Sequence, residues 1–348
     1  MYAARRRTSL TRWEIPAPYP DELTYNVVCR YLAQWGLQDV QGLLEQLLGV
    51  RVFATHPLSP LGIMPIAETA FAGYRDPLSH AVRHHTLLPY FNAFVPTPNR
   101  LRVKALLSQH PNPAVSDLVL QGARTYGTSK HLRICLECAA EQRRTWHETF
   151  WTRRHQLPGL HHCPEHRTVL LSSPVLLEVS TRFQLAPLDA QTIAASRPPD
   201  EPPLLGARLE GKIATQSLIL LSSGSTNACG TSPSSYRSIV AMLGFSGRSG
   251  RLRMHDFETS FLRWLEGNRC MPQCVGSTPW WRRLVTEVGC STTPLQHLLL
   301  QEFIRVRWRE RHEVQPDLFP LALPWSREAR TSRALKTLPT SIAGAEHG

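Results

Sequence analysis

The sequence contains two short metal-ligand motifs, Cys-Leu-Glu-Cys at 135–138 and Cys-Pro-Glu-His at 163–166. In each motif two residues separate the ligands, so that one tight turn can present both side chains to a single ion. Cys135, Cys138, Cys163 and His166 together complete a tetrahedral donor set without a vacant position. We therefore predict one structural Zn²⁺, which would stabilise a segment too small to build its own core.

Other histidines near the motifs leave alternatives open for the fourth ligand: His147, His155, His161 and His162. We prefer His166 because its spacing from Cys163 mirrors the spacing of the first pair. Two further alternatives are a catalytic zinc and a set of four unrelated core residues.

The segment between the motifs combines aromatic residues with two arginine pairs. Trp146 and Phe150 stand four residues apart, which predicts a shared helix face that packs this segment onto the rest of the fold. The arginines can either meet phosphates or remain solvated surface charge: Arg143, Arg144, Arg153 and Arg154.

The composition indicates a globular protein with a basic surface. The chain has 348 residues, which suggests roughly two to three domains, and its 42% hydrophobic content is sufficient for packed cores. The net charge is +12, and 35 of the 39 basic residues are arginines. This balance favours phosphate-rich partners, although a GC-rich genome would also enrich arginine.

No apolar run approaches the roughly 20 residues that a membrane-spanning helix needs. The first 20 residues are charged but contain no apolar signal-peptide core. We therefore expect a cytoplasmic protein without a membrane partner, in which the eight cysteines stay reduced.

The chain predicts a mainly α fold: an N-terminal helical region with an embedded structural zinc finger, then a helical, helix-turn-helix-like C-terminal domain. Asp21 is the expected N-cap of the first helix, and Gly36 its end. A second helix is expected around Val40–Leu48. We predict these units: a basic flexible arm at 1–14, the N-terminal helical region at 15–127, the zinc-finger segment at 128–170, a linker or bridge at 171–235, the helix-turn-helix-like domain at 236–311 and a disordered tail at 312–348.

The region 236–311 holds twelve arginines, no lysine and six acidic residues. Two helix-turn-helix-like layouts occur in it, and the second begins its last helix with Thr293 as N-cap and Pro294 at the first helical position. We predict that one face of that helix is exposed and can reach base edges or phosphates, although an ordinary helical hairpin would show the same pattern. The DNA-binding candidates of this region are Arg248, Arg251, Arg282, Arg283, Gln296, His297, Gln301 and Arg305.

Sequence signatures of catalysis are missing from the chain. It has no Walker-type phosphate loop, no Gly-x-Gly-x-x-Gly and no Gly-x-Ser-x-Gly. Its acidic residues form no pattern typical of a two-metal nuclease. We therefore expect a protein that is not an enzyme.

Three blocks of the chain resemble the TniQ/TnsD family of transposon proteins: PAPYPDELTYNVVCRYLAQWG at 16–36, PLSPLG with HHTLLPYFNAFV at 57–95, and LRICLECAAEQ with FWTRRHQLPGLHHCPEHRTVL at 132–170. A weaker likeness extends toward residue 305. Cys135, Cys138, Cys163 and His166 stand at the ligand positions of the family's zinc block.

The resemblance implies a target-site selector of a bacterial cut-and-paste transposon. Such a protein binds double-stranded target DNA and recruits an AAA+ ATPase that regulates the transposase. Other members dock on an RNA-guided CRISPR effector complex, which reads the sequence for them. The chain is shorter than the longest attachment-site readers, which favours this alternative, whereas its arginine-rich C-terminal region favours direct DNA binding.

Overall fold

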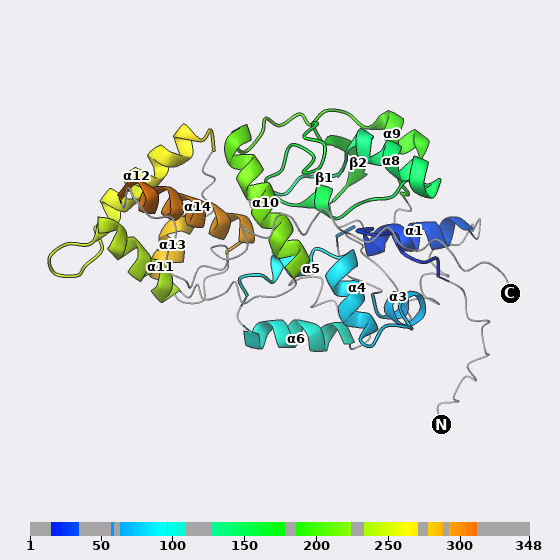
Figure 1. Cartoon of the computed structure of the whole chain (residues 1–348), viewed down its shortest axis with the longest axis horizontal. Coiled ribbons are helices and arrows are strands. Elements are labelled where there is room, and N and C mark those ends of the chain that lie inside the picture. Colours follow the sequence, from blue (N-terminus) through cyan, green and yellow to red (C-terminus); the bar gives the residue numbers. More distant parts are fainter. Residues whose placement is uncertain are drawn as a thin grey trace, which may run out of the picture.

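A computed structural model describes residues 15–34, 57–58, 63–95, 97–108, 127–177, 186–223, 233–270, 278–287 and 292–311. Over these ranges the protein is mainly α-helical with one two-stranded antiparallel sheet (Figure 1), which confirms the predicted fold class. The arm at 1–14, the helix expected around 40–48, Gly36 and the tail at 312–348 lie outside the described residues. The described helices include none that is long and apolar enough to cross a membrane.

The elements are α1 (Thr24–Gln34), α3 (Ile63–Ala70), α4 (Pro77–His85), α5 (Leu88–Phe91), α6 (Thr97–Ser108), β1 (His131–Ile134), α8 (Leu136–Trp146), the 3₁₀ turn η1 (Arg154–Gln156), β2 (Leu171–Leu176), α9 (Ala190–Ala195), α10 (Ala207–Ser223), α11 (Pro233–Val240), the π-helical turn η2 (Ala241–Phe245), α12 (Met254–Gly267), α13 (Trp280–Thr286) and α14 (Pro294–Arg311).

Helix α1 buries the apolar residues that recur at helical spacing in its sequence. Val27, Tyr31 and Leu32 are all at most 1% exposed, as the amphipathic pattern predicted. Asp21 is not its N-cap, because the helix begins at Thr24. Asp21 instead adopts a left-handed backbone conformation, with φ of 64°, and its carboxylate binds two arginines far along the chain.

The two strands frame the segment that contains the ligand motifs. β1 pairs with β2 so that His131 faces Leu176 and Ile134 faces Leu171. β1 leads directly into Cys135, which is the N-cap residue of α8. Only Ala139 and Gln142 of α8 are fully buried, so this helix lies mostly on the surface.

In the predicted linker, the described ranges 171–177 and 186–223 contain regular secondary structure. They contain β2, α9 and the 17-residue α10, and α10 packs against α4, α5 and α14. The buried face of α10 includes Leu209, Ile213, Leu220 and Leu221. Their helical spacing places them on one side of the helix. Proline-, serine- and glycine-rich stretches on both sides concealed this helix in the sequence.

Helix α14 begins with the predicted cap at Thr293 and Pro294. The Thr293 hydroxyl accepts from the Gln296 backbone N–H at 3.4 Å, and the Gln296 amide oxygen accepts from the Thr293 N–H at 2.9 Å. This reciprocal pair is a capping box. Every residue from Pro294 to Ile304 is buried, which makes α14 a core helix for most of its length.

The start of α14 fits into a space that two glycines leave open. Gly127 and Gly159 both have positive φ, and the N–H of Gly159 donates to the carbonyl of Gly127 at 2.7 Å. A Cβ atom at Gly159 would stand 2.9 Å from a methyl carbon of Leu295. Leu295 therefore couples the C-terminal helices to the segment that carries the ligand motifs.

We expect Leu295→Ala to lower the free energy of unfolding of the whole chain by about 2–5 kcal/mol, because it leaves a cavity at this joint. Chemical denaturation measures the change. Leu101→Ala is the matched control, since Leu101 is 63% exposed and its truncation creates no cavity. Equal stability of the two variants would contradict the claim that Leu295 couples the C-terminal helices to the segment with the ligand motifs.

Candidate metal centre and the polar junction beside it

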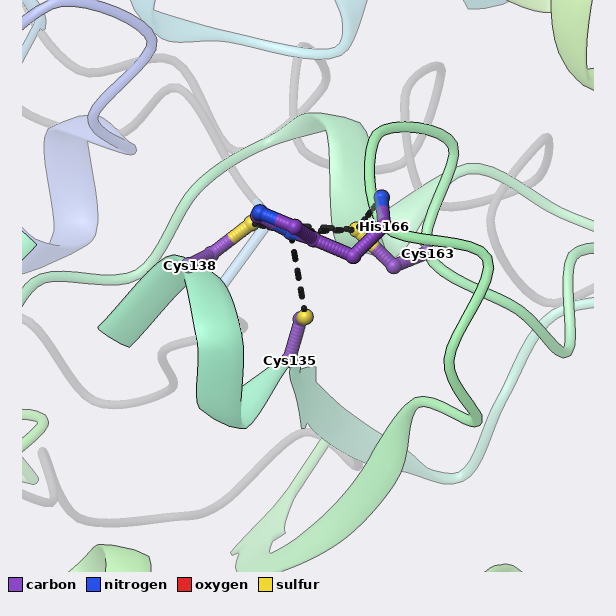
Figure 2. A group of neighbouring side chains, drawn as sticks. All are labelled: Cys135, Cys138, Cys163 and His166. Atoms are coloured by element: carbon purple, nitrogen blue, oxygen red, sulfur yellow. Dashed lines mark hydrogen bonds between the residues drawn. The ribbon is translucent and has the colours of Figure 1, made fainter. Parts of the chain in front are cut away.

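The structure brings the four predicted ligands together at one point. Cys135 and Cys138 lie on the first turn of α8, and Cys163 and His166 lie on the facing loop (Figure 2). The ligand atoms all lie within 4.8 Å of one another. This group could hold one metal ion.

Four of the six distances between the ligand atoms are close to the edges of a zinc-centred tetrahedron. His166 Nδ1 lies 3.3 Å from Cys138 Sγ, 3.6 Å from Cys135 Sγ and 3.8 Å from Cys163 Sγ, and the sulfurs of Cys138 and Cys163 are 3.7 Å apart. Zinc–ligand bonds of about 2.0–2.3 Å give tetrahedron edges of roughly 3.3–3.8 Å. Three thiolates and an imidazole are also the donor chemistry of structural zinc sites.

Backbone hydrogen bonds form the loop that presents Cys163 and His166. The N–H of Cys163 donates to the Thr168 carbonyl at 2.7 Å, and the N–H of Arg167 donates to the Cys163 carbonyl at 2.9 Å. Arg167 completes the turn with a positive φ of 62°. The backbone N–H of His166 also points at the Cys163 sulfur, at 3.5 Å.

Two side chains support the ligands from outside the cluster. His155 Nε2 lies 3.7 Å from Cys163 Sγ, and its other ring nitrogen lies 2.8 Å from the Thr152 hydroxyl. His166 Nε2 contacts a carboxylate oxygen of Glu141 at 3.1 Å. Such partners orient ligands and adjust how strongly they bind a metal.

The remaining candidate histidines have other places in the structure. His147 is exposed at the C-terminal end of α8. His162 binds the buried Glu210 of α10 through Nδ1 at 2.9 Å, and the same carboxylate accepts from the backbone N–H groups of His161 and His162 at 2.7 Å each. Glu210 therefore fastens the ligand loop to α10.

Hydrogen bonds between the thiols favour one deprotonated sulfur. A bond from Cys138 lowers the pKa of the Cys163 thiol to about 2, and the same bond raises the pKa of Cys138. Burial lowers the pKa of His166, but its hydrogen bonds to Cys163, Glu141 and Cys135 outweigh burial and raise it to about 9. Metal binding must displace such protons, so affinity should fall in acid.

A buried polar junction lies beside the ligand cluster, centred on Asp21. Its two carboxylate oxygens bind Arg153 Nε at 2.6 Å and Arg154 Nε at 2.8 Å. Burial alone would raise the pKa of Asp21, but the charges of Arg154 and Arg153 outweigh it and lower the pKa. Arg153 also donates to the carbonyls of Arg83 at 2.5 Å and Thr86 at 3.2 Å.

Glu22 forms the second part of this junction. Its carboxylate accepts from Asn26 Nδ2 at 2.5 Å, from the Tyr19 N–H at 2.7 Å and from Arg30 Nη1 at 3.1 Å. Burial raises the pKa of Glu22 to about 7 despite the charge of Arg30. The Glu22 carbonyl contacts His85 Nδ1 at 2.9 Å.

Backbone pairing joins the same two parts of the chain. The N–H of Leu23 donates to the Trp151 carbonyl at 2.9 Å, and the N–H of Arg153 donates to the Asp21 carbonyl at 3.1 Å. With Arg153 bound to the carbonyls of Arg83 and Thr86, the three family-like blocks of the sequence meet at this junction. Sequence reasoning gave Asp21 a capping role and did not anticipate its ion pairs, because their partners lie 132 and 133 residues away.

The expected aromatic face of the zinc segment forms differently from the prediction. α8 ends at Trp146, and His147 follows in the left-handed region with φ of 59°. Phe150 therefore lies beyond the helix. Both rings nevertheless contact Tyr19, with centroid distances of 5.1 Å for Trp146 and 4.8 Å for Phe150.

The structure separates the predicted DNA-binding residues into exposed and engaged groups. Arg143, Arg144, Arg248 and Arg251 are exposed. The engaged group consists of Arg153 and Arg154 bound to Asp21, Arg282 bound to Glu258 and Arg305 bound to Glu302. Arg283 belongs to neither group, because it is partly buried and its Nε has no hydrogen-bond partner among the described residues. DNA contact by any of them stays a prediction.

The expected exposed face of α14 is instead buried. Gln296, His297 and Gln301 are 8%, 7% and 1% exposed. Gln296 serves the capping box, and His297 contacts the hydroxyls of Tyr236 and Thr292 at 2.9 Å each. Gln301 donates to the same Tyr236 hydroxyl at 3.0 Å.

The reason for this burial is visible in the sequence of α14. Leu300 and Ile304 lie on the side that was expected to be polar, and both are at most 1% exposed. The ring of Phe94 stacks on His297 at 4.1 Å with an interplanar angle of 1°. The N-terminal part of α14 is therefore enclosed on all sides, and Gln296, His297 and the amide nitrogen of Gln301 bond within the protein.

We expect Asp21→Asn to lower the free energy of unfolding by about 3–5 kcal/mol near neutral pH, because it leaves the buried guanidinium of Arg153 without its counter-charge. The folded-state pKa of Asp21 is lowered, so its stabilisation is present above the unfolded pKa near 3.9 and is lost as pH falls below it. The variant should lack this acid-dependent loss, which denaturation at several pH values measures.

Glu201→Gln is the matched control for Asp21→Asn. Its ion pair with Lys130 is exposed, at 72% and 71%, and should contribute less than about 1 kcal/mol. Similar effects of the two substitutions would argue against a structural role for the junction.

We expect Cys138→Ser to remove the bound metal and to lower the thermal unfolding temperature, because three ligands hold an ion more weakly than four. Elemental analysis and calorimetry measure the two effects. Thr145→Ala, on the exposed side of α8, should keep both the metal and the stability. Full metal content in the Cys138 variant would disprove the ligand assignment.

Comparison with known proteins agrees with this architecture. The TniQ family model matches residues 15–170, the part that holds the ligand cluster and the polar junction. Over 153 residues, 43% of this chain, the sequence is 31% identical to the transposon Tn7 transposition protein TnsD of Escherichia coli, and the match spans 30% of that relative's length. The family match therefore covers the part of the chain that holds the three sequence blocks, and residues 15–170 are similar to the TniQ/TnsD family.

Proposed function

We propose that this protein is a non-catalytic target-site selector and adaptor of a bacterial cut-and-paste transposon. In this role it binds target DNA and recruits an AAA+ ATPase that regulates the transposase. The observation that carries the proposal is the family match over residues 15–170. The relative to which the chain is 31% identical is named a transposition protein.

The same proposal assigns one structural zinc ion to Cys135, Cys138, Cys163 and His166. Three sulfurs and one nitrogen satisfy a tetrahedral ion and leave no position for water or substrate. An ion held in this way stabilises the fold and does not catalyse a reaction. The five described cysteines are free thiols, which is compatible with the reducing cytoplasm that we propose as the location.

Direct contact with DNA is supported by the charge of the chain. The net charge is +12, and exposed arginines occur on α8 and between η2 and α12. A basic surface attracts the phosphate backbone at long range. Binding through this surface would place the adaptor on the DNA, where it can recruit the ATPase.

One observation favours a second candidate function. The side chains of α14 best suited to reading bases are buried and bonded within the protein. A selector with few base-reading groups could rely on an RNA-guided CRISPR effector complex for sequence recognition. The protein would then act mainly as a docking adaptor between that complex and the ATPase.

We expect the purified full chain to bind duplex DNA with an affinity that falls steeply with salt. Each phosphate contact contributes a slope of about 0.9 in a plot of log affinity against log salt concentration. Fluorescence anisotropy on the native insertion locus and on a shuffled duplex measures both the slope and the sequence preference.

The outcomes separate the two functions. Salt-dependent binding that prefers the insertion locus supports a direct selector. Salt-dependent binding without preference, together with co-purification of an effector complex, supports the docking adaptor. Failure to bind duplex DNA and the ATPase alike would refute the proposal.

A further inference from the structure

A short closed turn joins η2 to α12, and we call residues 246–253 the arginine turn. Ser246 and Leu252 form an antiparallel bridge. Within it the N–H of Gly247 donates to the Arg251 carbonyl at 2.8 Å, and the N–H of Gly250 donates to the Gly247 carbonyl at 3.0 Å. These bonds give the turn a fixed backbone before any partner binds.

The tip of the turn exposes backbone and guanidinium groups with little covering them. Residues 247–251 read Gly-Arg-Ser-Gly-Arg, and Arg248, Ser249 and Arg251 are exposed. Gly250 has φ of +74°, and a Cβ atom there would meet nothing within 4 Å. A phosphate could therefore approach the tip closely without steric hindrance.

Four of the ten other arginines in the region 236–311 form ion pairs with acidic residues. Arg282 binds Glu258 at 2.6 Å, Arg307 binds Glu310 at 2.8 Å, and Arg305 binds Glu302. Among the described residues, no acidic group forms an ion pair with Arg248 or Arg251. Positive charge without a counter-charge therefore gathers at the tip of the turn.

Two further arginines support the base of the turn. Arg253 donates to the Gly244 carbonyl at 2.7 Å and pairs with Asp256 at 3.1 Å. The guanidinium of Arg311, at the end of α14, packs against Gly244. The turn projects at the left edge of Figure 1, away from the sheet and α8.

We propose that the arginine turn binds the phosphate backbone of duplex DNA through Arg248 and Arg251 and does not read its bases. This proposal rests on the DNA-binding function proposed above. Arginine forms bidentate hydrogen bonds with phosphate, and the fixed backbone reduces the entropy lost on binding. The tip has no asparagine or glutamine to pair with adenine and no apolar side chain for the core of a protein interface.

The test compares the full chain with the variant Arg248→Gln/Arg251→Gln on two duplexes of unrelated sequence. The variant should bind both duplexes more weakly, by the same factor. Its slope of log affinity against log salt should be smaller by about 1.8, because two phosphate contacts are lost. The ratio of the native chain's affinity for DNA to that of the variant should therefore fall by roughly tenfold between 50 and 200 mM salt.

Two variants control for charge and for guanidinium geometry. Arg75→Gln/Arg102→Gln makes the same change in net charge at exposed residues of the N-terminal helical region, and its salt slope should stay native. Arg248→Lys/Arg251→Lys keeps the charge and should keep most of the slope, with weaker binding. Circular dichroism should show unchanged folding of all variants, since the substituted side chains are exposed.

Several results would overturn this inference. An unchanged slope in the glutamine variant, with a native chain that binds DNA, would exclude the arginine turn and leave the proposed function standing. A loss confined to one duplex would indicate base reading, and a loss only of ATPase binding would indicate a protein interface. A native chain that does not bind duplex DNA would refute the DNA-binding function and this inference together.

Discussion

The whole arrangement depends on four side chains that must reach one point from two separate turns. Cys135 can do so only if β1 delivers it to the start of α8, and Cys163 only if the loop before β2 folds back over that helix. The three ligand sulfurs belong to residues that are buried or partly buried beside core residues. An ion coordinated at this point would fix the path of the chain from β1 to β2. Other contacts build on this frame: Glu210 attaches α10 to the ligand loop, and Leu295 attaches α14 beside Gly159.

The polar junction explains why distant parts of the sequence behave as one unit. Asp21 lies before α1, whereas its partners Arg153 and Arg154 follow α8. Removing one partner of a buried ion pair is strongly destabilising, because it leaves the other charge uncompensated. The same Arg153 reaches the end of α4 through the carbonyls of Arg83 and Thr86. The described parts of residues 15–170 therefore contain two linked centres, the ligand cluster and the ionic junction.

Local patterns predicted local structure well, and long-range contacts explain where prediction failed. The ligand set followed from the spacing of Cys135, Cys138, Cys163 and His166, and the cap at Thr293 followed from the proline after it. By contrast, the burial of Gln296, His297 and Gln301 depends on Tyr236 and Phe94. Leu300 and Ile304 on the same side of α14 were a local sign of that burial, but the sequence of α14 could not identify the two partners. In the same way Asp21 resembles a helix cap in sequence, and only the folded chain shows its arginines.

The central claim is that one bound ion holds the ligand segment, α1 and α14 in a single cooperative structure. Hydrogen–deuterium exchange of the full chain, before and after chelation, tests it most directly, with native mass spectrometry to count the metal. The account predicts one zinc per chain and, once it is removed, faster exchange in β1 and α8, and also in α1 and the first turns of α14. Unchanged protection in α1 and α14 after complete removal of the metal would contradict it.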